Sequence, residues 1–424
     1  MQGAILAVGN ELIRGQVFNT TSFWAARELL ARGYTVKEIL TVPDEKDLIV
    51  KRLKEFLEAY NFCLVSGGLG PTTDDITNEA VAAALGRPLV VNEEMVRRIK
   101  EREQALNIPH NPLRLRMAEL PEGAVLLTNE RAMAGYYLKI GEKILFCLPG
   151  VPQEFRHLLK TRVLALLEDF LPPSEVIRHR LFKFFGLREA DINLKLKEIE
   201  EAFPEVSLGY YPVLPEIHVS VLVKAANEQK ADEIFSLVRE RLEREFGVYI
   251  FGYDDDLLEA VIGRLLLERH ETLAVAESCT GGLIASRITR IPGSSAYFER
   301  GVVTYSNQAK KEILGVPEEA LQKYGAVSEP VALAMAEGVR RLARTDYGLS
   351  VTGIAGPTGG SPEKPVGTVW IGFSCKEGTV ARCFLFPGDR HMVQAYAAET
   401  ALDWLRRYLR YGTLVPRYQF TCRG

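Results

Sequence analysis

Short apolar runs alternate with stretches whose apolar residues recur at helical spacing, and this alternation is the feature that most restricts how the chain can fold. It governs the first 170 residues, where predicted strands and helices follow one another. Such an order favours a mostly parallel sheet with helices on both faces. The strands are expected at 3–8, 35–42, 62–66 and 143–148, and the helices at 20–31, 45–60, 75–85 and 151–168.

The same alternation returns with different motifs after residue 256, whereas segment 174–252 has the order strand, helix, two strands and helix. A proline pair near residue 172 and a cluster of aspartates before residue 257 mark the breaks. We therefore predict the α/β class, with two different three-layer α/β domains joined by a small α+β module. The expected boundaries are 1–170, 171–255 and 256–424.

Length and composition narrow the class of protein further. A chain of 424 residues suits two or three domains that each bury a core. Apolar residues make up 47% and charged residues 25%, which excludes disordered, collagen-like and fibrous proteins. The formal net charge of −3 disfavours a nucleic-acid binder that works through bulk basic charge. The six cysteines are scattered and form no CxxC pair, which indicates reduced thiols. The sequence has no signal-like start and no apolar stretch long enough to span a membrane, so we expect a cytoplasmic chain.

A glycine-rich segment, SGGLGPTTDD at residues 66–75, joins a predicted strand to a predicted helix. Glycines there let the backbone approach a ligand closely, and a helix N-terminus offers free N–H groups to a phosphate. Thr72, Thr73 and Asp74 stand where the helix cap is expected. A capped turn that binds nothing accounts equally well for the spacing, because the segment matches neither the P-loop nor the dinucleotide fingerprint.

Carboxylates are expected beside this loop. Asp74 and Asp75 end the motif, Glu11 follows the first strand, and Glu154 opens the last helix of the region. Taken singly, each suits helix capping or a solvated position. Their shared placement at the carboxyl ends of strands favours a divalent cation, because carboxylates beside phosphate otherwise repel it.

These motifs, with GNELIRGQ upstream and LPGVPQEF downstream, resemble the molybdopterin-binding fold of the MoaB and MogA proteins. They resemble more closely the N-terminal half of the CinA family (competence/damage-inducible proteins), over about residues 1–170. The resemblance implies ADP-ribose pyrophosphatase activity that depends on a divalent metal ion (Mg, Mn or Co). It implies that Asp74 and Asp75 serve the metal or activate water, and that Asn19 touches the nucleotide. It also implies phosphate contacts from Gly67, Gly68, Gly70, Thr72 and Thr73.

A second motif, AESCTGG, ends a strand and opens a helix, so Ser278 is expected at a sharp turn. A serine there meets the requirements of a nucleophile, and the N–H groups of Thr280, Gly281 and Gly282 would stabilise an oxyanion. Cys279 is a rival nucleophile, although a thiol beside the loop can simply be packed. The motif is not GxSxG, so the α/β-hydrolase elbow is not indicated.

The base for this serine is sought in the segment YSNQAK, because no histidine of the region lies in a triad-like motif. Tyr305 ends a predicted strand and Lys310 lies just inside the next helix. Desolvation disfavours an ammonium group, so a partly buried lysine can lose its proton near neutral pH. This predicts a Ser–Lys pair assisted by Tyr305. The alternative is a lysine exposed on a helix surface.

Arg390 stands just before the last predicted helix, in FPGDR. Its guanidinium suits bidentate binding of a phosphate, and equally a salt bridge with Asp389 or Glu399.

The motifs AESCTGG, GSSAYFERGVVTYSNQAK, GAVSEPVA, TGIAGPTGG, EKPVGTVW and FPGDR resemble, in this order, the CinA C-terminal domain and the stand-alone nicotinamide mononucleotide deamidases. They span about residues 270–391. The resemblance implies metal-free hydrolysis of nicotinamide mononucleotide (NMN) to nicotinic acid mononucleotide and ammonia. Ser278 would be the nucleophile, and Lys310 with Tyr305 the proton-transfer pair. The residues implied to assist or to bind substrate are Ser295, Thr352, Gly353 and Arg390.

Segment 174–252 resembles the KH-like module between the two CinA domains, but its GXXG candidate at Gly186 lacks the second glycine. We expect a spacer or dimerisation module, and from the family a homodimer. The leading hypothesis is a cytoplasmic bifunctional enzyme that deamidates NMN and splits ADP-ribose to AMP and ribose 5-phosphate, with no nucleic-acid or membrane partner. The alternatives are an N-terminal domain that binds molybdopterin or a nucleotide without catalysis, and a DNA-uptake accessory protein, which the charge balance disfavours.

Overall fold

The computed structural model describes residues 1–127, 134–173, 175–416, 418 and 420–422. The chain divides into two compact units. One comprises residues 1–178 with 224–232, and the other residues 179–223 with 233–424. Most of the middle segment therefore groups with the C-terminal part of the chain.

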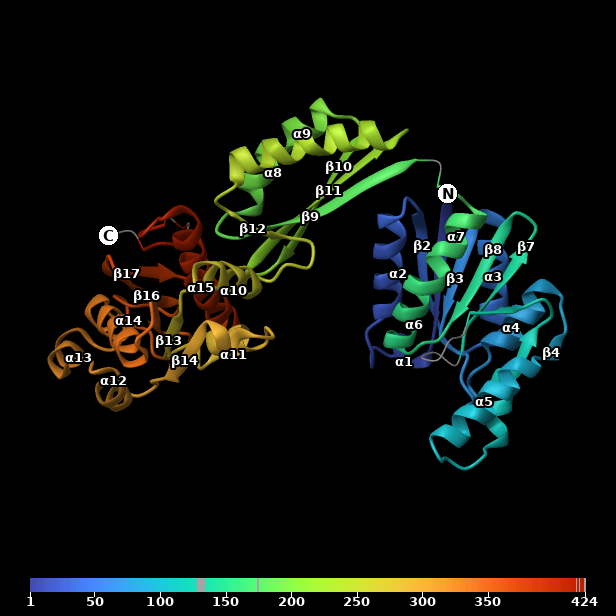
Figure 1. Ribbon diagram of the computed structural model, residues 1–424, viewed down its shortest axis with the longest axis horizontal. Helices are drawn as coiled ribbons and strands as arrows, with labels where there is room; N and C mark the ends of the chain where they lie inside the picture. Colours follow the sequence, from blue (N-terminus) through green and yellow to red (C-terminus); the bar gives the residue numbers. More distant parts are fainter. Residues whose placement is uncertain (128–133, 174, 417, 419, 423–424) are drawn as a thin grey trace. The chain divides into compact units, whose positions relative to one another are not determined.

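A six-stranded sheet forms the centre of the first unit (Figure 1). The first four strands in sheet order pair in parallel, and the last two pairings are antiparallel, which confirms a mostly parallel sheet. The antiparallel edge comes from a segment in which the sequence analysis expected no strand. In sheet order the strands are β2 (Thr35–Val42), β1 (Gln2–Val8), β3 (Phe62–Ser66), β8 (Lys143–Leu148), β7 (Tyr136–Ile140) and β6 (Val125–Leu126).

Alternate residues of these strands feed two separate cores, because successive strand side chains point to opposite faces. Ile5 and Leu64 pack with one set of helices, and Leu6 and Val65 with another. This is the predicted three-layer arrangement. The first set is α2 (Thr20–Ala31), α6 (Pro152–Leu158) and α7 (Leu164–Phe170), and the second is α3 (Lys46–Ala59) and α4 (Thr77–Leu85) (Figure 1).

The remaining elements of this unit are short or peripheral. A π-helical turn at Leu159–Val163 joins α6 to α7, where the sequence predicted one helix over 151–168. A small ribbon pairs two strands that the sequence did not predict. These further elements are α1 (Asn10–Ile13), β4 (Leu89–Val91), α5 (Glu93–Ala105), a 3₁₀ helix (Pro112–Ala118) and β5 (Glu119–Pro121).

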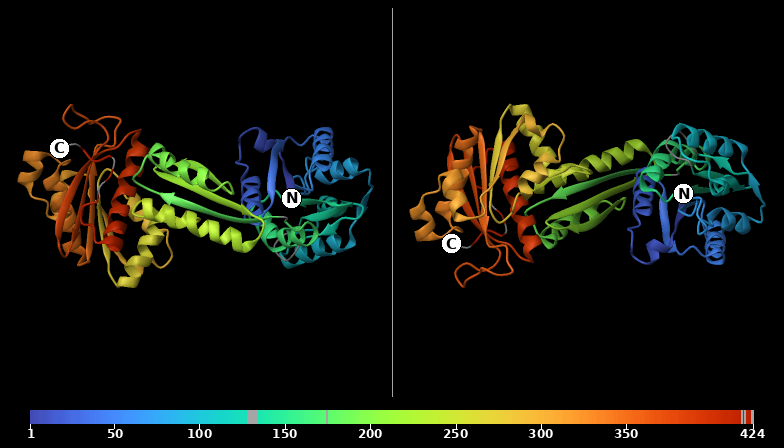
Figure 2. Two further views of the ribbon diagram at one scale, coloured as in Figure 1. Left: turned by 90° about the horizontal axis from the view of Figure 1, so that it is seen from above. Right: turned by 90° about the horizontal axis from the view of Figure 1, so that it is seen from below.

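The middle module is a four-stranded sheet with two helices on one face (Figures 1 and 2). Its sheet order is β10-β11-β9-β12. The predicted order is confirmed, and one strand is added that is too short to show an alternating pattern. The elements are β9 (Val176–Phe184), α8 (Glu189–Ala202), β10 (Val206–Val213), β11 (Glu216–Ala225), α9 (Glu228–Phe246) and β12 (Ile250–Tyr253).

The C-terminal domain is a second three-layer structure. Its five-stranded sheet has the order β14-β13-β15-β16-β17, in which the first three strands pair in parallel and the last two pairings are antiparallel. Val275 packs with one set of helices and Ala274 with the other. The strands are β13 (Leu273–Glu277), β14 (Phe298–Val303), β15 (Tyr347–Gly353), β16 (Thr368–Cys375) and β17 (Gly378–Leu385). The helices are α10 (Leu258–Arg269), α11 (Leu283–Thr289) and α15 (Arg390–Tyr411) on one face, and α12 (Asn307–Leu314), α13 (Glu318–Tyr324) and α14 (Glu329–Ala343) on the other.

Buried charges join α15 to the middle module inside the second unit. The Asp403 carboxylate accepts hydrogen bonds from Arg406 and Arg407, at 2.7 and 2.6 Å. The two guanidinium groups continue to backbone carbonyls of the module, at Val248 and Phe185. Buried charges are tolerated when they are paired and hydrogen-bonded, so this network fixes the module against the C-terminal domain.

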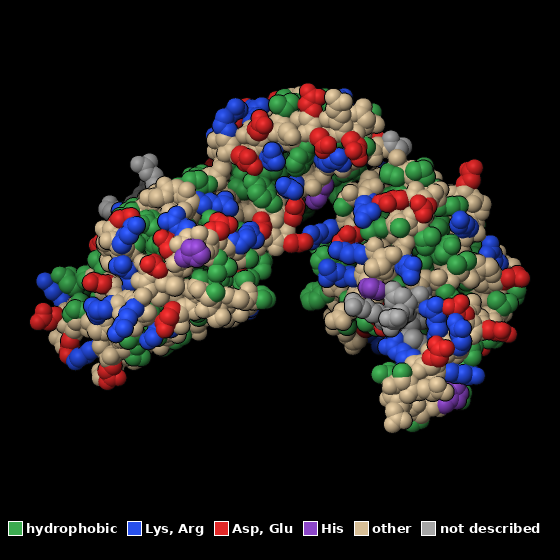
Figure 3. All heavy atoms as spheres, in the orientation of Figure 1, with side chains coloured by type: hydrophobic (Ala, Val, Ile, Leu, Met, Phe, Trp, Pro, Cys, Tyr) green, Lys and Arg blue, Asp and Glu red, His purple; other side chains and the backbone are tan. Residues whose placement is uncertain are grey.

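No helix in the described part of the chain is long and apolar enough to cross a bilayer. On the face shown in Figure 3, Lys and Arg side chains are interspersed with Asp and Glu. This mixture agrees with the near-balanced composition.

Candidate active sites

Ser278 and Lys310 meet at the carboxyl end of the C-terminal sheet. Ser278 follows β13, and its N–H donates to the Val351 carbonyl of the neighbouring strand β15 at 2.9 Å. Lys310 lies one turn into α12, whose first turn is capped by the Ser306 hydroxyl. The Lys310 Nζ is 3.0 Å from Ser278 Oγ, and the lysine is only 1% exposed. The structure therefore excludes the alternative of an exposed lysine.

The Lys310 amine is surrounded by three oxygen atoms, and its burial favours the neutral form. Nζ also lies 2.7 Å from the Thr304 carbonyl and 3.3 Å from the Tyr305 carbonyl. As an ammonium, Lys310 donates to all three oxygens; as a neutral amine, it can donate its two hydrogens to the two carbonyls and accept the Ser278 hydroxyl proton with its lone pair. Burial lowers the pKa of Lys310 below the ordinary lysine value, and the nearby Cys279 opposes this in part.

A buried carboxylate that the sequence analysis did not single out holds the turn after Ser278. Glu277 is the last residue of β13 and is 1% exposed. Its carboxylate accepts the N–H groups of Gly282, Ile284 and Ala285, at 3.0, 3.1 and 2.9 Å. It therefore occupies the N-terminus of α11. The signal in the sequence was a charged residue that directly continues an apolar strand.

This arrangement corrects the predicted oxyanion site. The Gly282 N–H is bonded to Glu277 and the Gly281 N–H to the Ser278 carbonyl, so neither is free for a substrate. Both glycines adopt positive φ, +64° and +100°, which explains why the turn needs them. Thr280 remains, since its hydroxyl oxygen is buried and has no hydrogen-bond partner among the described residues.

Cys279 is a poor nucleophile in this structure. Its side chain is buried in the core, and burial raises the pKa of the thiol to about 12. A thiol must ionise to attack, so this environment keeps Cys279 unreactive near neutral pH. The packed role, which the sequence left open, is the one that the structure supports.

Tyr305 and Arg390 form a separate pair near the Ser–Lys dyad. The Tyr305 hydroxyl accepts from the Arg390 guanidinium at 3.2 Å, and another guanidinium nitrogen donates to the Gly356 carbonyl at 2.8 Å. Tyr305 was predicted to assist proton transfer, but only its backbone carbonyl contacts Lys310 in the described structure. The alternative of a salt bridge to Asp389 or Glu399 is not found among the described residues: Asp389 caps α15 and Glu399 pairs with Arg287.

The other predicted residues of this site lie at the same sheet edge or outside it. Thr352 and Gly353 end β15, beside the Ser278 turn, and the Thr352 hydroxyl donates to the Ala326 carbonyl at 2.9 Å. Ser295 is exposed in a short 3₁₀ turn, Ser294–Ala296. Within the described residues, no hydrogen bond joins Ser295 to the dyad.

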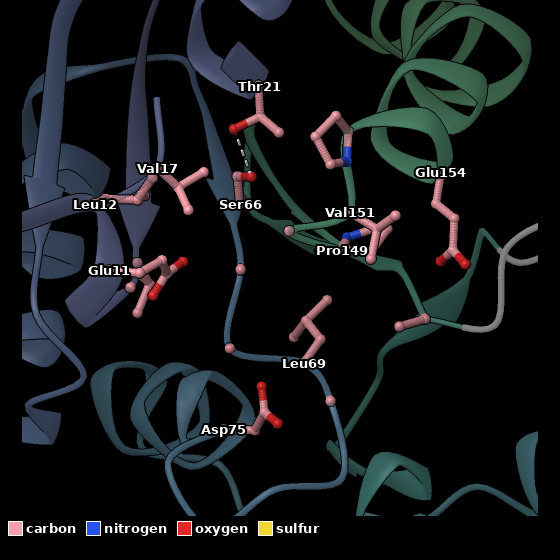
Figure 4. A pocket seen from close by; sticks show the side chains of 18 of the residues that line it. Glu11, Leu12, Val17, Thr21, Ser66, Leu69, Asp75, Pro149, Val151 and Glu154 are labelled. Atoms are coloured by element: carbon pink, nitrogen blue, oxygen red, sulfur yellow. Dashed lines mark hydrogen bonds between the residues drawn. The ribbon is translucent and has the colours of Figure 1, made fainter. Parts of the chain in front are cut away.

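A pocket of about 480 Å³ lies at the carboxyl ends of β1, β3 and β8 in the first unit (Figure 4). It is lined by most of the residues predicted for the N-terminal site. Figure 4 shows Glu11 and Asp75 on one side of the pocket and Glu154 across it. The predicted residues that line it are Glu11, Asn19, Gly67, Gly68, Gly70, Asp74, Asp75 and Glu154.

Thr72 and Thr73 are not among the lining residues, and they do not cap the helix as predicted. Helix α4 begins later, at Thr77, whose hydroxyl donates to the Gly67 carbonyl at 2.9 Å. The Thr72 hydroxyl instead contacts the carboxylates of Asp74 and Asp75. Asn19 likewise has a structural partner, because its side chain caps α2.

Asp44 is a further carboxylate on the pocket wall that the sequence analysis did not include. It follows β2, so the argument used for Glu11 would have found it. Burial raises its pKa, and the charges of Glu11, Asp74 and Asp75 raise it further. The Thr72 hydroxyl lowers the pKa of Asp74. These groups therefore share one electronegative region.

The donor chemistry fits a hard divalent cation, although the described residues contain no group of three such side chains placed to bind one ion. Magnesium commonly uses one or two protein carboxylates, with substrate phosphates and water as its other ligands. Asp74 and Asp75 are suited to that mode. Glu154, across the pocket, belongs to a different part of the wall.

Comparisons with known proteins extend over the whole chain. Family models match residues 4–169 ("Probable molybdopterin binding domain"), 179–252 ("Damage-inducible protein CinA KH domain") and 255–409 ("CinA C-terminal domain"). A CinA-like protein of Desulfotalea psychrophila is 42% identical over 407 residues, 96% of this chain and 98% of its own length. The chain belongs to the CinA family. CinA-like proteins of Syntrophus aciditrophicus and Geobacter sulfurreducens are 43% and 42% identical, over 97% and 96% of this chain and 99% of each relative.

The family models and these relatives confirm the resemblance to CinA proteins drawn from the motifs at both ends of the chain. The models also confirm a KH-like module between them. The names of these relatives describe a competence/damage-inducible family and specify no reaction.

Proposed function

We propose that this CinA-family chain is a bifunctional hydrolase of NAD breakdown products. Its C-terminal domain would convert NMN to nicotinic acid mononucleotide and ammonia, and its N-terminal domain would split ADP-ribose to AMP and ribose 5-phosphate. The observation that carries the proposal is the buried Lys310 amine, 3.0 Å from the Ser278 hydroxyl.

The geometry supports nucleophilic attack by Ser278 on the carboxamide carbon. Lys310 takes the hydroxyl proton as Ser278 Oγ bonds to that carbon, and negative charge develops on the carbonyl oxygen. The Thr280 hydroxyl, buried and without a hydrogen-bond partner among the described residues, would be a donor to this charge. A donor of this kind is typically worth about 2.7–4 kcal/mol.

The tetrahedral intermediate collapses when Lys310 returns the proton to the amide nitrogen, which leaves as ammonia. An ester between Ser278 and the nicotinoyl carbon remains. Water then attacks this ester, with Lys310 accepting its proton and returning it to Ser278 Oγ. The amide C–N bond is thus replaced first by the C–O bond of the ester and then by the C–O bond of the acid, and Ser278 and Lys310 end in their starting states.

Arg390 would bind the phosphate of NMN from a position set by Tyr305 and Gly356. We expect Arg390→Lys to raise KM for NMN by about 10- to 100-fold with little change in kcat, because lysine cannot bind phosphate through two parallel hydrogen bonds. Steady-state kinetics with NMN and with its nucleoside, which lacks the phosphate, would measure this. An equal loss on both substrates would remove Arg390 from phosphate binding.

For the N-terminal domain, the proposal rests on the pocket bordered by the glycine loop and the carboxylates. Asp74 and Asp75 would hold a divalent cation, which when bound would offset the negative charge of the pyrophosphate. The backbone of Gly67, Gly68 and Gly70 would lie against the phosphates, since no side chain intervenes there.

Asp74→Asn should lower ADP-ribose hydrolysis by about 10²-fold or more, with partial recovery at higher metal concentration, because one metal-binding charge is lost. Asp74 is the better probe of the two, since Asp75 also accepts the Thr72 N–H and so holds the loop. Asp47→Asn, on the exposed face of α3, is the matched control. Undiminished hydrolysis in excess chelator would exclude a role for metal.

A paired assay of the purified full chain with NMN and with ADP-ribose, with and without divalent metal, tests the whole proposal. We expect ammonia release from NMN that is independent of metal and AMP release that requires it. If ADP-ribose or a pterin binds but is not cleaved under any metal condition, the N-terminal domain is a binding module. If NMN yields no ammonia, the amidohydrolase proposal fails.

A further inference from the structure

The end of the chain adds a short strand to the exposed edge of the C-terminal sheet. The Leu385 N–H of β17 donates to the Phe420 carbonyl, and the Cys422 N–H donates to the Cys383 carbonyl, both at 2.9 Å. Between these bonds, Phe384 and Thr421 form an antiparallel bridge. The described residues 420–422 therefore cover part of a sheet edge that would otherwise be unpaired.

This pairing places Cys383 directly opposite Cys422. The two residues lie one step from the Phe384–Thr421 bridge, in opposite directions along the two strands, so they are cross-strand partners on one face. Hydrogen-bonded antiparallel partners have Cα atoms about 5.5 Å apart, which lies within the roughly 4.4–6.8 Å that a disulfide spans. Both are free thiols of intermediate exposure, whereas the other four cysteines are buried.

We propose that Cys383 and Cys422 are a redox modification site, which a small-molecule disulfide such as oxidised glutathione converts into a reversible intramolecular disulfide. The inference does not rest on the proposed catalytic function. It concerns two thiols outside both candidate sites.

The chemistry balances as thiol–disulfide exchange. The thiolate of Cys422 attacks one sulfur of the oxidant, so a mixed disulfide forms and one small thiol leaves. Cys383 then attacks the Cys422 sulfur, and the second small thiol leaves. The two protein thiols are oxidised and the small disulfide is reduced to two thiols. Burial, and then the neighbouring Cys422 thiol, raises the pKa of Cys383 to about 12, so Cys383 is disfavoured as the first attacking thiolate. Its attack on the mixed disulfide is intramolecular, and the cross-strand pairing holds the two sulfur-bearing residues side by side for it.

The tether would fix the end of the chain beside the loop that presents Arg390. Phe420 packs against Phe386 and Tyr396, with ring centroids 5.9 and 5.2 Å apart. Phe386 precedes that loop, and Tyr396 lies two turns into the helix that follows it. A covalent bond at Cys422 would therefore hold Phe420 against both ends of this segment.

The test treats the full-length chain with oxidised glutathione, quenches exchange with acid and counts thiols after denaturation. We expect two of the six thiols to be lost and the mass to fall by two hydrogens. Peptide mapping should find Cys383 linked to Cys422, and a reductant should restore all six thiols. Six remaining thiols, or a crosslink between other cysteines or between two chains, would overturn the proposal.

Two independent variants guard against misfolding of one of them. Cys383→Ser and Cys422→Ser should each abolish the intramolecular link, and Cys383→Ser should retain one glutathione on Cys422. Hydrogen exchange at the Cys422 amide should be slower in the oxidised wild type than in the reduced protein, because the tether opposes opening of the terminal strand. An unchanged exchange rate in the linked protein would refute the proposed tethering of the chain end.

Discussion

Ser278→Ala is expected to lower kcat for NMN deamidation by about 10⁴-fold or more, because it removes the atom that forms the covalent intermediate. The variant should keep its fold, since alanine preserves the Ser278 N–H bond to Val351 that continues the strand pairing. Hydrolysis of ADP-ribose, in a separate unit of the chain, should continue at the wild-type rate. Ammonia release and AMP release, measured on the same preparation, check both statements.

Cys279→Ala is the matched control for this prediction. The thiol lies next to Ser278 in sequence, but it is packed in the core and has a strongly raised pKa. We expect deamidation to stay within a few-fold of wild type, with some loss of stability from the small cavity. Deamidation that survives Ser278→Ala and disappears in Cys279→Ala would transfer the nucleophilic role to the thiol.

The sequence predicted the framework of both α/β domains well, because their central strands are buried on both faces. Such strands appear as short apolar runs with abrupt ends, and those at 62–66 and 143–148 have the predicted bounds, as does the partly exposed edge strand at 35–42. Peripheral strands such as β6 and β12 were missed because they are too short to carry a periodic pattern.

The sequence predicted where the candidate sites lie better than it predicted the hydrogen-bond partners of their residues. Parallel strands bring their carboxyl ends to one edge, which is why Ser278 lies beside β15 and why Glu11 and Asp75 share a pocket. Spacing alone does not reveal which N–H groups are already occupied. The Glu277 carboxylate accepts a hydrogen bond from the Gly282 N–H, and the Tyr305 hydroxyl accepts one from Arg390. Neither hydrogen bond can be predicted from a motif.

The depth of Lys310 was the least predictable feature and the most consequential. Lysine is rarely fully buried, so composition argues against it. The structure buries it because α12 follows β14 closely, so that the side chain points back to the carbonyls at the strand end. Burial of the side chain in the folded domain lowers the pKa of the amine, and no local pattern reveals that burial.

Lys310→Met should lower deamidation by about 10³–10⁴-fold, because methionine has similar length but cannot accept the Ser278 proton. In the wild type, kcat/KM should fall on the acid side as Lys310 becomes protonated, at a pH below the ordinary lysine value. The residual activity of the variant should lack this acid limb. Rates measured from pH 5 to 10 on both proteins test the role, and an acid limb that persists in Lys310→Met would assign it to another group.

Lys310→Met should also change how the free energy of unfolding depends on pH. Because the folded state lowers the pKa of Lys310, the unfolded chain binds more protons than the folded one between the lowered pKa and about 10.4. Wild-type stability should therefore rise with pH across that window, and Lys310→Met should lack this rise. Lys311→Met is the matched control, since Lys311 lies in an exposed pair with Glu318 and should leave both the activity and the pH slope unchanged. Urea unfolding at several pH values measures the slopes, and equal slopes in wild type and Lys310→Met would mean that Lys310 ionises as an ordinary solvated lysine.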